Sequence, residues 1–310
     1  MAAQSKAQLL TDVHTLLKKR YQLEPRASRL NVLEAVIYAI CHEGTTREQA
    51  NQALSRFKDE FFDWNEVRVS TVEQIQGVLA GLPEPEARAQ RVRRFLRQLF
   101  EKTYGFTLDA LLKKPLKEAV KALQEYEALH SDYVLSSVIR DALGGHAIPV
   151  DGPTRRCLER LGIAEPEAEI SSIRGMLERA VPKNRGAEFS DLLEELAHDT
   201  CVAGTPDCPR CELRKICPTG QERLNADKTA TRAAAKAANV KETDKAKPEA
   251  PAPAEPKTKT ASAKPAAAKL EPKAPAKTSS KDEKPAASRT PPVPPPASPR
   301  SSKGKGRPAK

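Results

Sequence analysis

The chain has 310 residues and a formal net charge of +11, from 52 Lys and Arg against 41 Asp and Glu. No apolar run approaches the ~20 residues that a membrane-spanning helix needs, which excludes an integral membrane protein of the helical kind. Residues 1–10 show no signal-peptide pattern. We therefore expect a cytoplasmic protein, associated with the nucleoid if the source is bacterial, whose cysteines are reduced.

The positive charge is concentrated in residues 223–310. This segment holds 21 of the Lys and Arg residues, 8 of the Asp and Glu residues and 15 of the 26 prolines, and it has no Phe, Trp or Tyr. Because it has so little apolar surface to bury, we expect it to be disordered. Two interpretations remain: a basic arm that binds nucleic-acid phosphates by counterion release, which we favour, and a solubilising tail without a dedicated partner.

Residues 1–222 show the apolar periodicity of helices from end to end. In 7–20 the apolar residues recur at i, i+3 and i+4, which predicts an amphipathic helix. In 29–42 they cover most of the circumference, which predicts a buried central helix. The predicted helices are 7–20, 29–42, 46–61, 72–81, 85–104, 113–129, 131–143, 153–161, 170–181 and 187–200.

Extended segments are almost absent from this part of the sequence. Residues 147–150 are at most a short connector between a helix that stops at Gly144-Gly145 and a helix that begins near Pro153. Trp64 has aromatic neighbours and is expected in the core. The pattern as a whole predicts an all-α protein.

Four cysteines near the end of the foldable part have the spacing C-x6-C-x2-C-x5-C. They are Cys201, Cys208, Cys211 and Cys217. Four thiolates this close together hold either a [4Fe–4S] cluster or structural zinc. Zinc ribbons usually pair two Cys-x2-Cys knuckles, and this motif has only one, which favours the cluster and leaves zinc as the alternative. The other two cysteines, Cys41 and Cys157, lie in apolar helical patterns, and we expect them in the core.

The order of these features resembles a known family. A buried helix, several amphipathic helices, Ile148-Pro149-Val150-Asp151 and then the cysteine motif resemble the endonuclease III branch of the helix-hairpin-helix DNA glycosylases. The resemblance implies a two-domain, all-α, monomeric glycosylase fold that binds double-stranded DNA and flips the target base out of the stack. It also implies a [4Fe–4S] cluster on the four cysteines.

The resemblance also implies a division of the chain into domains. A six-helix barrel with a degenerate hairpin is expected at 24–145. An iron–sulfur cluster domain is expected from 1–23 together with 146–222. Residues 223–310 follow as the disordered Lys/Ala/Pro-rich tail.

The catalytic residues of the family are matched only in part. Asp151 falls at the position of its catalytic aspartate, which implies that this carboxylate assists water; the alternative is a simple helix cap before Pro153. Tyr133 stands where bifunctional members have a lysine, and a phenol cannot form their Schiff base. Tyr133 is therefore expected either to wall the base pocket or to be an ordinary interfacial aromatic residue.

The expected DNA contacts differ from the family as well. Glu43 falls where the family has a glutamine that fills the gap left by the flipped base; the alternative is a solvated acid at a helix end. The hairpin glycines are missing, Asp132 adds a negative charge there, and the loop between Cys201 and Cys208 has no Lys or Arg. Arginines on two helices are candidate phosphate contacts, with a solvated basic face as the alternative. They are Arg155 and Arg156 on one helix, and Arg91 and Arg94, within a run that also includes Arg88, on the other.

Two functional hypotheses follow. The first is a base-excision-repair enzyme, a monofunctional DNA N-glycosylase that uses Asp151 and water and lacks lysine-dependent lyase activity. The second is a catalytically inactive DNA-binding paralogue that keeps the cluster and draws its affinity from the basic tail. The retained Val150-Asp151 step favours the first, and the lost hairpin glycines and lysine favour the second.

Overall fold

The computed structural model describes residues 5–23 and 30–243, with side chains to residue 231. Every regular element in these ranges is a helix, so the all-α prediction is confirmed. None of the described helices is long and apolar enough to cross a membrane. The predicted domain start at residue 24 and the tail beyond residue 243 lie outside the described residues.

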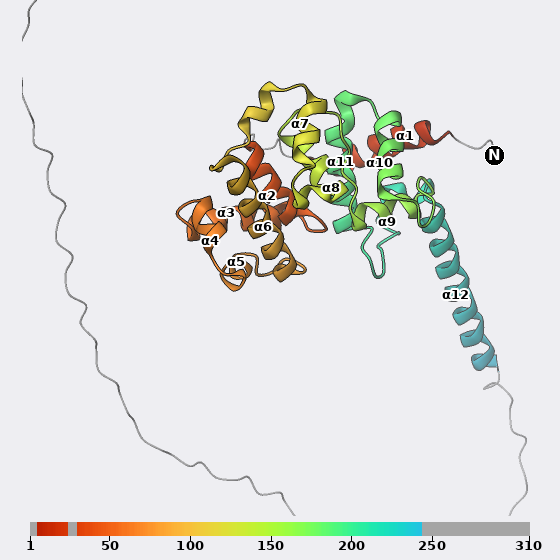
Figure 1. The fold of residues 1–310 in the computed structure, drawn as a ribbon. Coiled ribbons are helices and arrows are strands. Elements are labelled where there is room, and N and C mark those ends of the chain that lie inside the picture. Colours follow the sequence, from red (N-terminus) through yellow and green to blue (C-terminus); the bar gives the residue numbers. More distant parts are fainter. Residues whose placement is uncertain (1–4, 24–29, 244–310) are drawn as a thin grey trace, which may run out of the picture. The chain divides into compact units, whose positions relative to one another are not determined.

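The helices follow one another along the chain as shown in Figure 1. The α-helices are α1 (Lys6–Arg20), α2 (Val32–His42), α3 (Arg47–Glu60), α4 (Trp64–Val69), α5 (Val72–Val78), α6 (Pro85–Thr103), α7 (Leu116–Leu123), α8 (Asp132–Asp141), α9 (Gly152–Arg160), α10 (Ile170–Ala180), α11 (Lys183–Asp199) and α12 (Pro218–Thr243). The 3₁₀-helices are η1 (Asp109–Lys113), η2 (Glu127–His130) and η3 (Glu212–Lys215).

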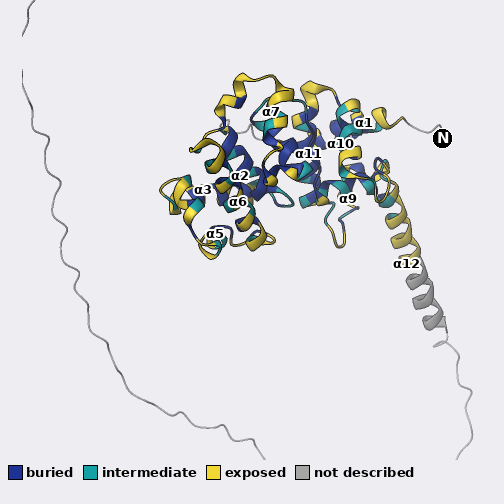
Figure 2. Ribbon diagram, in the orientation of Figure 1, coloured by how far each residue is buried: buried dark blue, intermediate teal, exposed yellow. Residues whose placement is uncertain are grey.

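The first hydrophobic core is built around α2. Asn31 caps this helix and forms a capping box with Glu34, which fixes where the helix begins. Nine of its eleven residues are buried, and α3, α6 and α8 pack against it, so α2 lies among the dark blue ribbons of Figure 2. The predicted buried central helix is confirmed. This core takes its residues from 32–147, and Cys41 lies within it.

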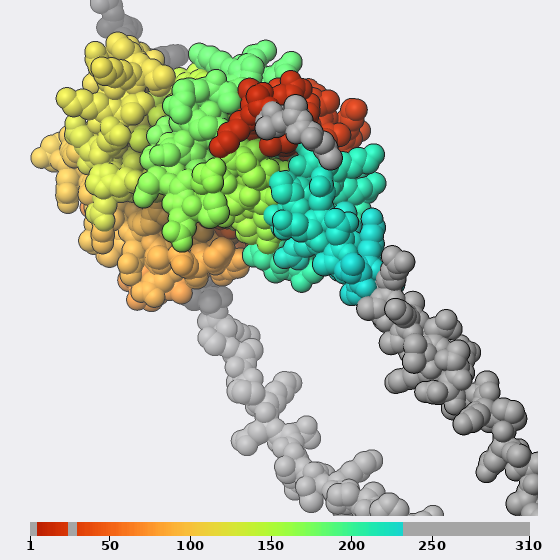
Figure 3. Space-filling view, turned by 90° about the vertical axis from the view of Figure 1, so that its right-hand side faces the viewer, coloured from red at the N-terminus to blue at the C-terminus, as the bar shows by residue number. Residues whose placement is uncertain are grey.

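The second hydrophobic core joins the N-terminal helix to the later part of the chain. Leu10, Val13 and Leu17 of α1 are buried in one cluster with residues from 148–213, among them Cys157. In Figure 3, α1 in red lies beside the cyan segment, which agrees with the packing of α1 against α11 and η3. The chain passes from the first core to the second between Ala147 and Ile148.

The single helix predicted at 113–129 is wrong. Lys114 is extended, with φ −92° and ψ 154°, and α7 begins only after Pro115. The proline ring disfavours a helical conformation in the preceding residue, so the helical pattern is split. A further helix, α4, was not predicted; its signal is the cap at Asp63, whose side chain accepts from the backbone N–H of Glu66.

The predicted tail begins too early. The sequence predicts disorder from residue 223, whereas α12 continues to Thr243. Alanine has the highest helix propensity, and the first part of the segment is rich in alanine, so local propensity sustains the helix. The side chains described from residue 221 to 231 are almost all exposed. Figure 1 shows α12 extending away from the other helices.

Candidate functional site

A groove of about 510 Å³ lies where five segments meet. It is lined by the loop after α2, the first turns of α6, the start of α8, the turn before α9 and the first residue of α10, and we call it the α2–α9 groove. Four of the residues singled out from the sequence line it together: Glu43, Arg91, Tyr133 and Asp151. They are separated by up to 108 positions in the sequence and are brought together only by the fold.

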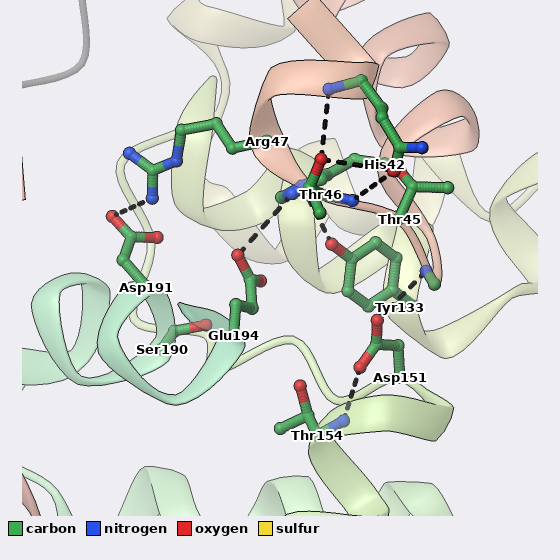
Figure 4. Close-up of polar contacts among 12 residues, drawn as sticks. His42, Thr45, Thr46, Arg47, Tyr133, Asp151, Thr154, Ser190, Asp191 and Glu194 are labelled. Carbon is green, nitrogen blue, oxygen red and sulfur yellow. Dashed lines mark hydrogen bonds and ion pairs between the residues drawn. The ribbon is translucent and has the colours of Figure 1, made fainter. Parts of the chain in front are cut away.

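Asp151 is buried at the edge of this groove, with 4% of its surface exposed. One carboxylate oxygen accepts from the backbone N–H of Thr154 at 2.9 Å (Figure 4), so Asp151 caps α9. The other accepts from the backbone N–H of Gly44 at 3.0 Å. Gly44 has φ +73°, a left-handed conformation that favours glycine. The cap interpretation therefore describes the structure, and the same carboxylate also lines the groove.

Tyr133 lines the groove from α8 and is 3% exposed. Its hydroxyl lies 3.0 Å from Nδ1 of His42, the last residue of α2. Burial raises the pKa of Tyr133 well above its ordinary value, and the carboxylates of Glu194 and Asp151 raise this pKa further. Tyr133 therefore stays protonated, and it offers the groove a neutral aromatic side chain.

Glu43 closes one side of the groove through two contacts. Its Oε2 lies 2.6 Å from the guanidinium of Arg91, and its Oε1 accepts from the hydroxyl of Ser131 at 2.7 Å. Asp132, the acid expected to weaken phosphate binding, is paired with Arg174 at 2.8 Å. Glu43 and Asp132 thus both have an arginine partner within the protein.

Arg88 also lines the groove, but it serves the end of α2 rather than a ligand. Its guanidinium is 7% exposed and donates to the carbonyls of Ile40, Cys41 and Glu43. It also donates to the carbonyl of Pro83 at 2.7 Å. The last carbonyls of a helix have no N–H partner within that helix. The Arg88 side chain supplies such partners at the end of α2.

We expect Arg88→Met to destabilise the protein by about 2–4 kcal/mol, because the buried carbonyls lose their charged donor. The measurement is the urea midpoint, followed by circular dichroism. Arg97→Met is the matched control, since Arg97 is exposed on the same helix, and it should leave the midpoint unchanged. Equal midpoints for the two variants would contradict the capping role of Arg88.

The remaining arginine candidates are held by other groups. Arg94 pairs with Glu127 and lines, with Arg91 and Ser131, a smaller hollow of about 280 Å³. Arg155 pairs with Glu159 at 2.7 Å, one turn along α9. Neither Arg155 nor Arg156 lines the groove.

Arg156 contacts the protein backbone instead. It donates to the carbonyl of Ala197 at 2.9 Å and to that of Cys201 at 3.0 Å. This arginine thus fixes the start of the cysteine loop to α9.

A buried charged network behind the groove was missed by the sequence reasoning. Arg140 donates to Ser190 at 2.8 Å and lies 3.5 Å from Asp191. Asp191 also pairs with Arg47 at 2.9 Å, and Nε2 of His42 lies 3.7 Å from Glu194. The network joins α2, α3, α8 and α11, and Figure 4 shows much of it. The pairs named here are 50 or more positions apart, so no local sequence pattern predicts them.

The four motif cysteines line one small hollow, of about 30 Å³, beside the second core. All are free thiols. Nη1 of Arg160 lies 3.4 Å from Sγ of Cys201, and the backbone N–H of Gly220 donates to Sγ of Cys217 at 3.3 Å. In the described part of the chain, no three His, Cys, Asp or Glu side chains converge on a single ion. A [4Fe–4S] cluster instead takes one thiolate at each of four irons, so four thiols around a hollow fit it.

Comparison with known proteins points in one direction. No family model matches the chain. It is 33% identical over 86 residues to endonuclease III of Bacillus subtilis (strain 168), which covers 28% of this chain and 39% of that protein. It is 32% identical over 72 residues to an endonuclease III homolog of Encephalitozoon cuniculi (strain GB-M1), over 23% of this chain and 30% of that protein. The matches thus span less than half the length of either relative.

Solved structures give the fold over a longer stretch. A trapped covalent complex of endonuclease III with DNA matches 72% of this chain and 100% of that chain, with a TM-score of 0.59 and 17% identity. A thermostable thymine-DNA glycosylase matches 70% of this chain and 97% of that chain, with a TM-score of 0.52 and 18% identity. The resemblance to the endonuclease III-like branch, first seen in the motifs, is confirmed in fold and in part of the sequence.

Proposed function

We propose that this endonuclease III-like chain is a monofunctional DNA N-glycosylase, in which Asp151 and a water molecule cleave the bond between a base and its deoxyribose. The observation that carries the proposal is the α2–α9 groove, where Asp151, Tyr133 and Glu43 line one hollow from three separate segments. The named relatives, endonuclease III and a thymine-DNA glycosylase, support the same class of reaction.

Asp151 is positioned for an electrostatic role. Departure of the base leaves oxocarbenium character on the sugar, which a fixed carboxylate in the groove stabilises. Each oxygen of Asp151 accepts one backbone N–H, and the remaining lone pairs are available to a water molecule. These hydrogen bonds come from Gly44 and Thr154, so α9 and the loop after α2 together set the direction of the carboxylate.

Tyr133 makes the lyase route unavailable. A lyase of the family type needs an amine that condenses with the sugar carbon, and a buried, protonated phenol does not form a Schiff base. Water is then the nucleophile, and the product is an intact strand with an abasic site.

Double-stranded DNA is the proposed partner. Arg91 and Arg94 are the proposed phosphate contacts, and Glu43 is the proposed wedge behind the flipped base. The ion pairs of Arg91 with Glu43 and of Arg94 with Glu127 have to open for this. Arg155, Arg156 and the basic segment beyond residue 243 are further proposed contacts.

The division of the chain and its cofactor are part of the same proposal. We infer a barrel at 24–145 and a cluster domain from 1–23 and 146–222, supported by the two separate hydrophobic cores. Cys201, Cys208, Cys211 and Cys217 are the proposed ligands of a [4Fe–4S] cluster. Such a cluster, when bound, braces the loop that carries its ligands.

One observation favours a second candidate, a DNA-binding paralogue without catalysis. Of the arginines that line the groove, Arg91 is paired with Glu43 and Arg88 is bound to carbonyls. Glu84, Glu43, Asp132 and Asp151 all line the groove as well. A groove with this many carboxylates repels phosphates, so binding would then depend on the basic segment beyond the described residues.

A base-excision panel separates the two candidates. Duplexes carrying uracil, thymine glycol, 8-oxoguanine, G·T or A·8-oxoguanine are incubated with metal-loaded protein at low salt. We expect strand cleavage of at least one duplex, and only after alkali, because the abasic product is not cut without a lysine. Cleavage without alkali would contradict the monofunctional mechanism. Binding without excision of any base would favour the paralogue.

A further inference from the structure

The hydroxyl of Tyr133 is anchored below the groove by a chain of two side chains. It lies 3.0 Å from Nδ1 of His42, and Nε2 of His42 lies 3.7 Å from the carboxylate of Glu194. His42 is 3% exposed and Glu194 is 6% exposed. The three residues come from α8, α2 and α11, so three helices together fix the positions of these side chains.

The two residues that flank His42 decide which of its ring nitrogens carries the proton. A carboxylate beside Nε2 favours a proton on that nitrogen, which leaves Nδ1 as the acceptor for the O–H of Tyr133. Tyr133 remains protonated because burial raises its pKa. The hydroxyl thus has a partner away from the groove, and in Figure 4 it points to His42 while the ring lies toward Asp151.

We propose that His42, backed by Glu194, is a positioning residue that holds the Tyr133 ring as a fixed wall of the α2–α9 groove, against which a flat extrahelical base stacks. Tyr133 then acts through its ring and not through its hydroxyl. The nature of the ligand rests on the proposed function, whereas the anchoring of the ring does not.

The surroundings of His42 support a fixed ring. Tyr38 packs on the imidazole from the preceding turn of α2, with the ring centroids 5.2 Å apart. The rings of His42 and Tyr133 meet edge to face at 6.2 Å. Arg140, 4.0 Å from Glu194, faces the other end of the chain. The imidazole of His42 is therefore held between Tyr38, Tyr133 and Glu194.

The test uses substitutions that replace one ring nitrogen at a time. In His42→Asn the amide oxygen takes the place of Nδ1 and still accepts from Tyr133, whereas in His42→Gln the amide reaches the place of Nε2 and leaves the hydroxyl without its acceptor. We expect His42→Gln to lower the single-turnover excision rate about tenfold, the value of one base–aromatic stack, with little change in duplex affinity. His42→Asn should recover most of that loss.

Tyr133→Phe should match His42→Gln, and the double variant should be no slower than either, because both break the same link. Tyr126→Phe is the matched control, a buried tyrosine of the first core. Equal rates for the Asn and Gln variants, or additive losses in the double variant, would overturn the proposal.

A measurement without DNA keeps the inference separate from the proposed function. Carbon-13 NMR of labelled tyrosine rings should show a slowly flipping Tyr133 in the native protein and in His42→Asn, and a rapidly flipping ring in His42→Gln. Rapid flipping in the native protein overturns the anchoring whatever the excision result. Absence of excision with a slowly flipping ring overturns the proposed function alone.

Discussion

Asp151→Asn abolishes most base excision while leaving the fold in place. The substitution keeps an oxygen for the cap of α9 but removes the negative charge that stabilises the sugar and orients water. We expect the single-turnover rate to fall about 10²–10³-fold, the usual cost of removing one group that stabilises the charge of the transition state. The rate is measured on whichever duplex the excision panel identifies, with product read after alkali.

The structural role of Asp151 has to be separated from the catalytic one. Asn caps a helix as well as Asp does, but its amide group cannot accept from both Gly44 and Thr154, so one buried N–H loses a partner. That loss costs about 1–3 kcal/mol, which melting temperatures report independently of activity. If the excision rate falls strongly while the variant stays folded at the assay temperature, the loss of the charge, and not the loss of stability, accounts for the slower excision.

Asp63→Asn is the matched control. Asp63 caps α4 and accepts from the backbone N–H of Glu66 at 2.8 Å, and it does not line the groove. Its rate should equal that of the native protein. If Asp151→Asn keeps its rate to within about threefold, Asp151 is a helix cap alone and another group carries the excision.

The helices were predictable where the information is local. The apolar residues around α2 predict its burial without knowledge of its neighbours, and Asp151-Gly152-Pro153 predicts a helix start. The helix at 113–129 was predicted too long at both ends. At its start Pro115 was the stronger signal, since it acts on the backbone directly. At its other end the helix stops at Leu123, six residues before the predicted end.

The burial of Arg88 was predictable from its position on α6. The apolar stripe of α6 includes Val92, Phe95 and Leu99, and Arg88 lies one turn before Val92 on the same face. Its position predicts burial, whereas its membership of a run of arginines suggests a phosphate contact. The face of the helix, and not the composition of the run, decides where such a side chain lies.

The buried network lies beyond what one sequence shows. His42 contacts Tyr133 from 91 positions away and Glu194 from 152. The sequence around a histidine at the end of an apolar helix does not predict which distant residues contact it. These pairs follow from how α2, α8 and α11 pack, so the positioning of Tyr133 was accessible only from the structure.

Replacing any one of the four motif cysteines by serine should cost more stability than any substitution in the groove. Cys201, Cys211 and Cys217 pack against the second core, and Leu213 within their loop is fully buried. A lost cluster would release the loop and with it the packing of η3 on α1. We expect a loss of more than about 4 kcal/mol, a size typical of metal loss, and a melting temperature lower by roughly 10 °C.

Cys41→Ala is the matched control for this series. Cys41 is a buried cysteine of the first core and does not line the cysteine hollow, so the variant should lose little stability and keep its visible absorbance. The Ser variants should lose that absorbance together with bound iron and sulfide. Zinc in the purified native protein would contradict the [4Fe–4S] cluster and support a structural zinc site, which is the alternative left by the cysteine spacing. Native protein that holds neither iron nor zinc at full stability would contradict both, because the loop would then be held by its packing and by protein hydrogen bonds such as those of Arg20, Arg156 and Arg160.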